Sequence, residues 1–452
     1  MTLRALLAIV LLSSCAVPPA APRPEPGAGL PPMRAFQAER AAAPARPNAE
    51  IARDFLELAF ELESGRALPR LTRFEGPISL RVLGPAPESL ETDLDQLLGR
   101  LRDEAGIEIA RVPAAAEAGI TVQVVPGETL QRAVPAAACF VVPRVTDWRG
   151  FLRNRRGPEI DWATLERRER LAVFVPGDVA PQEMRDCLHE ELAQALGPLN
   201  DLYRLNDSVF NDDNFHTVLT GFDMLILRAT YAPELRSGMT REEVARALPR
   251  VLDRLNPAGA RRDSVAADPT SRDWSEEIER ALGGAASTAA RREAAARAVG
   301  IARARGWEDN RLAFSLFALG RLSIAEDPDL ALGAFLRAAE IYGRDPATRL
   351  HGAHVAMQLA AFALSAGQPE SAIAIVDANT DAVIEAQNAA LLSTLLMVKA
   401  EALRDTGQVA AARRLRSEAL GWARYGYGDP AEILERAGEI AALAPNGRKT
   451  GS

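Results

Sequence analysis

The chain has 452 residues, of which 48% are hydrophobic and 25% are charged, the composition of an ordinary soluble globular protein. This length exceeds what one simple core accommodates, so we expect two or more domains. The net charge of −8, with no long basic run, argues against non-specific binding to nucleic acid or to anionic lipid.

The N-terminal residues predict export and lipid attachment. The apolar run 5–12 is much shorter than the roughly 20 residues that span a bilayer, so it fits the core of a signal peptide over 1–14. The next residues, Leu12–Cys15, resemble a bacterial lipobox, in which the cysteine is lipidated and becomes the mature N-terminus. Ordinary signal cleavage, which would discard Cys15, is the alternative. We favour a lipoprotein of the cell envelope, and Ala16 favours the outer membrane, facing the periplasm, because it is not the aspartate of inner-membrane retention.

The following residues predict a tether and then an α+β domain. Residues 15–48 are rich in proline and alanine, as in a semi-rigid spacer. Apolar alternation and helical spacing then interleave over 49–256, which predicts a mixed sheet with packed helices. The expected strands are 78–83, 107–112, 120–125, 139–142 and 171–175, and the expected helices are 49–64, 89–104, 181–197, 215–231 and 240–252.

The remainder predicts an all-α domain. A polar linker is expected at 257–274, alanine-rich helices at 275–445, and a disordered tail at 446–452. Gly367-Gln-x-x-x-Ala372 and Gly407-Gln-x-x-x-Ala412 repeat one pattern, which resembles degenerate tetratricopeptide repeats. A generic alanine-rich helical bundle is the alternative.

One helical segment keeps the spacing of a zinc-peptidase motif but not its ligands. The motif reads His-Glu-x-x-His-x-x-Gly-x-x-His. This chain has Glu190, Glu191, Gln194, Gly197 and Asn200 in that frame, so the general-base glutamate and the glycine remain while every ligand histidine is replaced. Neutral amides are poor zinc ligands, so we predict no metal and no cofactor, and zinc is not favoured.

Glu191 falls among the apolar residues of this helix, where an unpaired charged carboxylate is costly. It therefore has either a partner or a raised pKa. A raised pKa suits a general base, with Glu190 and Gln194 beside it as candidate catalytic groups. Bonding to the backbone of a neighbouring strand or loop is the alternative, and both stay open.

Two further groups of residues are candidates for the cleft. Oxygen and imidazole donors lie downstream of the motif, without the spacing of a calcium loop, so a solvated turn is favoured over a metal site. Those donors are Asp201, Asp207, Asp212, Asp213 and His216. Cys139 and Cys187 form either a disulfide, which an oxidising periplasm permits, or two buried thiols.

Four sequence blocks resemble the bacterial "domain of unknown function 2927" family over about residues 75–252. The blocks are Cys187-Leu-His-Glu-Glu-Leu-Ala-Gln-Ala-Leu-Gly197, Asn200-Asp201, Val209-Phe-Asn-Asp-Asp213, and Thr220-Gly-Phe-Asp223 through Tyr231. That family is similar to zincin-like metallopeptidases in layout. The resemblance therefore implies a zincin-like α+β fold and specifies no activity.

These patterns lead to three functional hypotheses. The first is a lipoprotein with a degenerate peptidase-like cleft that binds a peptide or protein, with the helical repeats as a second interaction surface. The second is an active metal-dependent hydrolase with Glu191 as base, and the third is a scaffold in which only the repeats act. In each, the membrane is contacted only through the lipid anchor, and nucleic acid is not a partner.

Overall fold

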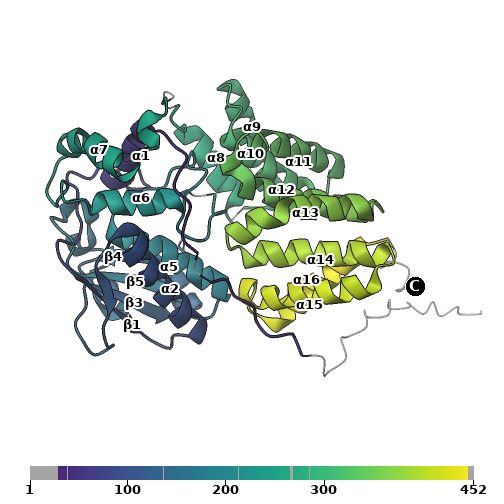
Figure 1. Ribbon diagram of the computed structural model, residues 1–452, viewed down its shortest axis with the longest axis horizontal. Coiled ribbons are helices and arrows are strands. Elements are labelled where there is room, and N and C mark those ends of the chain that lie inside the picture. Colours follow the sequence, from purple (N-terminus) through teal and green to yellow (C-terminus); the bar gives the residue numbers. More distant parts are fainter. Residues whose placement is uncertain are drawn as a thin grey trace, which may run out of the picture.

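The computed structural model describes residues 29–445, apart from Ala38, Ala136, Asp212, 265–267 and Ala285. It has two parts that lie side by side, an α/β part built on one sheet and a wholly helical part (Figure 1). The expected order, a region of helices and a mixed sheet followed by a helical region, is thus confirmed, and the first region is α/β where α+β was expected.

The sheet has five strands in the order β2-β1-β3-β5-β4. Their bounds are β1 Ile78–Leu83, β2 Ile109–Arg111, β3 Ile120–Val125, β4 Phe140–Pro143 and β5 Leu171–Pro176. All neighbours are parallel except β4, which runs antiparallel to β5 at one edge. The sheet is therefore mixed, as expected, and β4 has no strand on its outer side among the described residues.

Helices cover both faces of this sheet. Helices α2 Glu88–Ala105, α5 Pro181–Leu196 and α6 Gly221–Thr230 pack together on one face, over the larger apolar core. The shorter α3 Gly127–Ala133 and α4 Trp148–Asn154 belong to the opposite face, where a smaller core forms. The rings of that second core are Phe140, Trp148, Phe151 and Phe174. Two further helices, α1 Asn48–Phe60 and α7 Arg241–Leu255, pack on each other.

In the helical part, each helix packs against the next (Figure 1). The bounds are α8 Arg272–Leu282, α9 Thr288–Ala304, α10 Asn310–Ser323, α11 Pro328–Tyr342, α12 Arg349–Ser365, α13 Pro369–Glu385, α14 Ala389–Asp405, α15 Val409–Gly426 and α16 Pro430–Leu443. Short 3₁₀ turns lie at Pro158–Ile160, Trp162–Thr164, Gly259–Arg261 and Pro346–Thr348. The repeated glycines Gly367 and Gly407 both have positive φ at the turns before α13 and α15, which explains why the pattern recurs there.

Among the element boundaries that differ from the sequence prediction, two have a clear physical cause. Helix α6 begins at Gly221 and not near Phe215, because the Thr220 side chain and Asp223 form a capping box there. Helix α8 begins at Arg272, inside the expected linker. Its Trp274 is fully buried in the helical core and donates a hydrogen bond to Ser315 Oγ at 2.9 Å.

The expected tether contacts the folded parts from Leu30 onward. Phe36 stacks on Trp422 of α15, with ring centres 4.4 Å apart. Further along, the Ala41 N–H donates to Glu104 of α2, and Arg46 pairs with Asp54 of α1 at 3.0 Å. Residues 29–47 thus lie across both parts of the molecule, in contrast to a spacer that stands clear of them.

The predicted signal peptide, the lipidation site Cys15 and the tail 446–452 lie outside the described residues. Among the helices that the structure describes, none is long and apolar enough to cross a membrane.

Candidate functional site

The motif helix α5 is buried on nearly every side. It has Pro181 in its first turn and ends at Gly197. The apolar residues expected to face the core are all buried: Met184, Cys187, Leu188, Leu192, Ala195 and Leu196. His189, on the opposite side, is buried as well, and its Nδ1 accepts a hydrogen bond from the Leu219 N–H at 3.0 Å. Burial lowers the pKa of His189 well below its ordinary value, so this imidazole is neutral.

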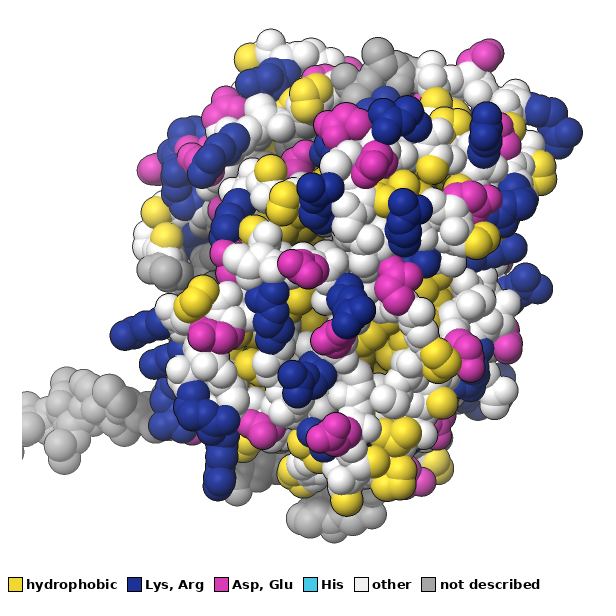
Figure 2. Space-filling view, turned by 90° about the vertical axis from the view of Figure 1, so that its left-hand side faces the viewer, with side chains coloured by type: hydrophobic (Ala, Val, Ile, Leu, Met, Phe, Trp, Pro, Cys, Tyr) yellow, Lys and Arg dark blue, Asp and Glu magenta, His cyan; other side chains and the backbone are white. Residues whose placement is uncertain are grey.

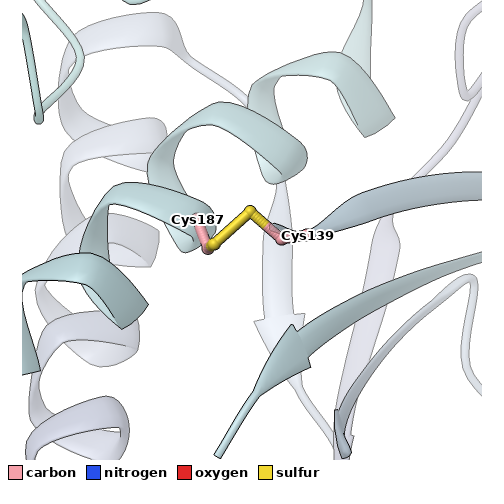
Figure 3. The surroundings of a disulfide bond; sticks show 2 residues. All are labelled: Cys139 and Cys187. Carbon is pink, nitrogen blue, oxygen red and sulfur yellow. A yellow bond between two sulfur atoms is a disulfide. The ribbon is translucent and has the colours of Figure 1, made fainter. Parts of the chain in front are cut away.

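A disulfide joins Cys187 of α5 to Cys139, the residue before β4 (Figure 3). Of the two alternatives that the sequence leaves open, the structure has the bonded one. The bond fixes the edge of the sheet to the middle of the motif helix.

Glu191 makes a second connection between the same two elements. Its carboxyl group accepts a hydrogen bond from the backbone N–H of Val141 in β4. That N–H faces away from β5, because the pairing of the Arg144 N–H with the Arg170 carbonyl sets the alternation along the strand. Glu191 therefore bonds to the outer edge of the sheet. This is the bond to the backbone of a neighbouring strand that the sequence leaves open as the alternative to a general base.

The other oxygen of Glu191 is unusual. Glu191 is 4% exposed, and its Oε2 is buried without a hydrogen-bond partner among the described residues. Burial raises the pKa of Glu191 well above its ordinary value, and the negative charges of Glu190 and Glu63 raise it further. The structure therefore combines both sequence alternatives, a backbone bond and a raised pKa.

A pocket of about 520 Å³ opens beside Glu191. Four carboxylates line it, Glu63, Glu190, Glu191 and Asp201, and no lysine, arginine or histidine is among its described lining residues. Gln194, Asn214, Phe140 and Trp162 also line it, although the Phe140 ring packs in the small core on the opposite face of the sheet. Sequence reasoning missed Glu63, because it follows α1 and is far from the motif in the chain.

Only part of the zinc-ligand frame reaches this pocket. Glu190 and Gln194 line it, while the Asn200 side chain donates to the Glu57 carbonyl at 3.2 Å and so holds α1. Gly197 lies against Thr230, which a Cβ at this position would approach within 3.2 Å. Among the described residues, no three His, Cys, Asp or Glu side chains come together as a metal site. Carboxylates can bind zinc, but amides are poor zinc ligands, and the usual zinc sites also need imidazole or thiolate ligands, which the described lining lacks.

Of the described donors predicted downstream of the motif, only Asp201 lines the pocket, and Asn214 of the same segment lines it as well. Asp207 pairs with Arg46, and the His216 ring bonds to the Asn206 carbonyl at 2.9 Å. Asp213 accepts a hydrogen bond from His351 of α12 at 2.9 Å. Asp212 lies outside the described residues. This loop therefore connects the two parts of the molecule and does not complete a ligand shell.

Arg168 is a structural residue that sequence reasoning missed. It is 2% exposed and donates to the carbonyls of Gln194 and Gly197, at the C-terminus of α5. A cation is favourable at that end of a helix, where backbone carbonyls lack partners. Its guanidinium carbon also lies 5.2 Å from the ring centre of Trp162. No local pattern marks this residue, because its contacts come from distant segments.

Residues 48–250 match the model of a family described as "Protein of unknown function (DUF2927)". This region is a DUF2927 domain. The match includes α5, β4, the disulfide and the pocket, and ends within α7, so the helical part lies beyond it. No curated protein matches the chain.

The DUF2927 domain docks onto the helical part through the first turns of α5. Gln182 bonds to Asn388 at 3.2 Å, and Arg185 donates to the Gln387 carbonyl at 2.7 Å. Tyr425 of α15 donates to Asp93 of α2 at 2.7 Å. The helix that lines the pocket therefore also carries the interface.

A larger cavity, of about 930 Å³, lies between the DUF2927 domain and the helical part. Its lining includes arginines and carboxylates that already pair with one another, as Arg204 does with Asp54 at 2.6 Å and Arg349 with Glu385 at 3.0 Å. The pocket beside Glu191 differs, because its lining charges are all of one sign.

Proposed function

We propose that this protein is a binding protein of the cell envelope, and that the pocket beside α5 takes up part of a peptide or protein. The observation that best supports this proposal is that the walls of the pocket are fixed to each other. Its β4 wall is joined to α5 both by the disulfide and by the Glu191 bond to Val141. A preformed site binds without the free-energy cost of ordering its own walls.

The zincin-like layout remains part of this proposal. The motif helix lies against a mixed sheet, and an antiparallel edge strand borders the cleft. This supports a degenerate peptidase-like cleft in which the positions of the ligand histidines hold Glu190, Gln194 and Asn200.

Hydrolysis by Glu191 is the second candidate, and one observation favours it. A buried carboxyl with a raised pKa and an unpartnered oxygen is the state in which a general acid or base is kept. Against it, the same carboxyl is engaged by the β4 backbone, and Asn200 is turned to α1.

We also propose that the helical part supplies a second, tetratricopeptide-like interaction surface, and that a lipid on Cys15 anchors the protein at the outer membrane, facing the periplasm. A scaffold in which the repeats act alone is less well supported, because Tyr203 and Phe215 of the DUF2927 domain belong to the helical core.

The test is peptide capture from a synthetic random heptapeptide library by the purified protein, read by mass spectrometry. Ala138→Trp would fill the pocket, since Ala138 lines it and is exposed. Ala115→Trp is the matched control on an exposed loop outside the lining. We expect enriched peptides with the wild type and the control but not with Ala138→Trp. Equal capture by all three would overturn the pocket as the site.

A further inference from the structure

We infer that the pocket beside α5 binds a positively charged organic group, a primary ammonium or a guanidinium. This inference rests on the proposed function and names the part of the peptide or protein that enters.

The first argument is charge. Glu63, Glu190, Glu191 and Asp201 line one pocket, and no basic side chain among its described lining residues offsets them. On the side of the DUF2927 domain that Figure 2 shows, by contrast, arginines and carboxylates are interspersed. Like charges brought together in a partly buried site disfavour one another, so a cation that enters gains from all of them.

The second argument is the unpartnered Oε2 of Glu191. A buried carboxyl oxygen without a donor costs free energy, and the described residues of the domain supply no donor to it. Ammonium and guanidinium groups carry several N–H donors and no acceptor, so they complement a pocket of oxygen atoms. Gln194 and Asn214, whose side-chain amides each carry an acceptor oxygen, also line the pocket.

The third argument separates an organic cation from a metal ion. The volume of about 520 Å³ suits a whole side chain, and Trp162 provides apolar wall for its methylene groups. Among the described residues, no three His, Cys, Asp or Glu side chains, those of the pocket included, are grouped closely enough to hold one metal ion.

Binding of a cation has a consequence for protons. A positive charge next to Glu191 favours its ionised form, so the entering group displaces a proton from this carboxyl group. The expected overall change is uptake of one cationic group and release of up to one proton, which leaves the charge of the Glu191 carboxyl balanced by the ligand.

The probes are four C-terminally amidated tripeptides, three of them also blocked at the N-terminus, measured by calorimetry with the full chain. The first three, Ac-Ala-Lys-Ala-NH₂, Ac-Ala-Arg-Ala-NH₂ and Ac-Ala-(acetyl-Lys)-Ala-NH₂, test the side-chain cation, and H-Ala-Ala-Ala-NH₂ tests a free amino terminus. Glu190→Gln removes one lining charge and keeps its shape. Glu117→Gln removes an exposed charge outside the lining and is the matched control.

We expect at least one cationic peptide to bind at least tenfold more tightly than the acetyl-lysine peptide. Glu190→Gln should weaken this binding tenfold or more, while Glu117→Gln leaves it unchanged. Buffers of different ionisation enthalpy should reveal proton release that Glu191→Gln abolishes.

Three results would overturn the inference. In the first, the wild type captures library peptides and Ala138→Trp does not, but the captured peptides are not enriched in cationic residues. The pocket would then bind peptides without preferring a cation, so the inference would fail and the proposed function would stand. Stoichiometric Zn²⁺ or Ca²⁺ binding lost in Glu190→Gln, without binding of any tripeptide, would make the pocket a metal site. Absence of both peptide capture and tripeptide binding would reject the inference and the proposed function together.

Discussion

The carboxyl group of Glu191 accepts a hydrogen bond from the backbone N–H of Val141, so a side chain of α5 occupies the outer edge of β4. Cys139, two residues before Val141 in the chain, forms a disulfide with Cys187 of the same helix. The wall of the pocket is thus joined to α5 by one covalent bond and one hydrogen bond. The predictions below follow from these connections and from the interface of α5 with the helical part.

Glu191→Gln is expected to change how stability depends on pH. Because the folded-state pKa of Glu191 lies above the unfolded value of 4.5, the stability linked to its protonation is full below pH 4.5 and is lost as pH rises through the folded-state pKa. Glutamine keeps the acceptor for Val141 and does not titrate. In urea unfolding from pH 5 to 9, the variant should gain stability relative to the wild type as pH rises. If the difference in free energy of unfolding between the variant and the wild type did not change with pH, the raised pKa would be contradicted.

Removal of the disulfide should destabilise the protein by about 3–4 kcal/mol, since the bond closes a loop with a sequence separation of 48 residues. Cys139→Ser with Cys187→Ser, or reduction of the wild type, should lower the urea midpoint equally. The double variant should be insensitive to reductant. If the reductant left the urea midpoint of the wild type unchanged, the cysteines would not be bonded in solution.

Phe215→Ala should loosen the two parts of the molecule. Phe215 comes from the DUF2927 domain but packs edge-on against Phe314 and Phe317 of α10, with centres 5.7 Å and 5.6 Å away. Its truncation should cost about 3–4 kcal/mol and increase the radius of gyration in X-ray scattering. Phe151→Ala is the matched control, because Phe151 is equally buried, at 5% exposed, but lies in the small core of the sheet. If both variants left the radius unchanged, this contact would not hold the interface.

Acid should weaken the same interface through His354 of α12, because its ring centre lies 4.4 Å from that of Phe215. Burial lowers the pKa of His354 to about 3, and the neighbouring His351, Arg321 and His216 oppose its protonation further. The stability linked to its neutral form is present above pH 6.5 and is lost as pH falls from there toward 3. As pH falls from 6.5 to 5, the free energy of unfolding of His354→Leu should therefore rise relative to that of the wild type by about 1 kcal/mol per pH unit. An identical acid dependence in both proteins would contradict this role.

The sequence predicts the elements well because their signals are local. Alternation marks β1 and β3 at their observed bounds, and Pro181 and Gly197 mark the two ends of the motif helix. Capping explains the late start of α6, which the apolar spacing alone extends to Phe215.

The site is less predictable, because long-range packing determines it. The motif indicates Glu190, Glu191 and Gln194, which do line one pocket, but Glu63 joins them from a distant loop and Asn200 turns away. Asp213 and His216 appear beside the motif in the chain and yet contact the helical part, because the loop that carries them crosses to it.

The central claim, that the cleft binds and does not cleave, is tested most directly by incubating wild-type and Glu191→Gln protein with the heptapeptide library, with and without added Zn²⁺. Mass spectrometry then counts intact and cleaved peptides. We predict intact peptides in every sample, with the same peptides retained by the wild type. Cleavage by the wild type that disappears in Glu191→Gln would contradict the claim and identify Glu191 as the base of a hydrolase.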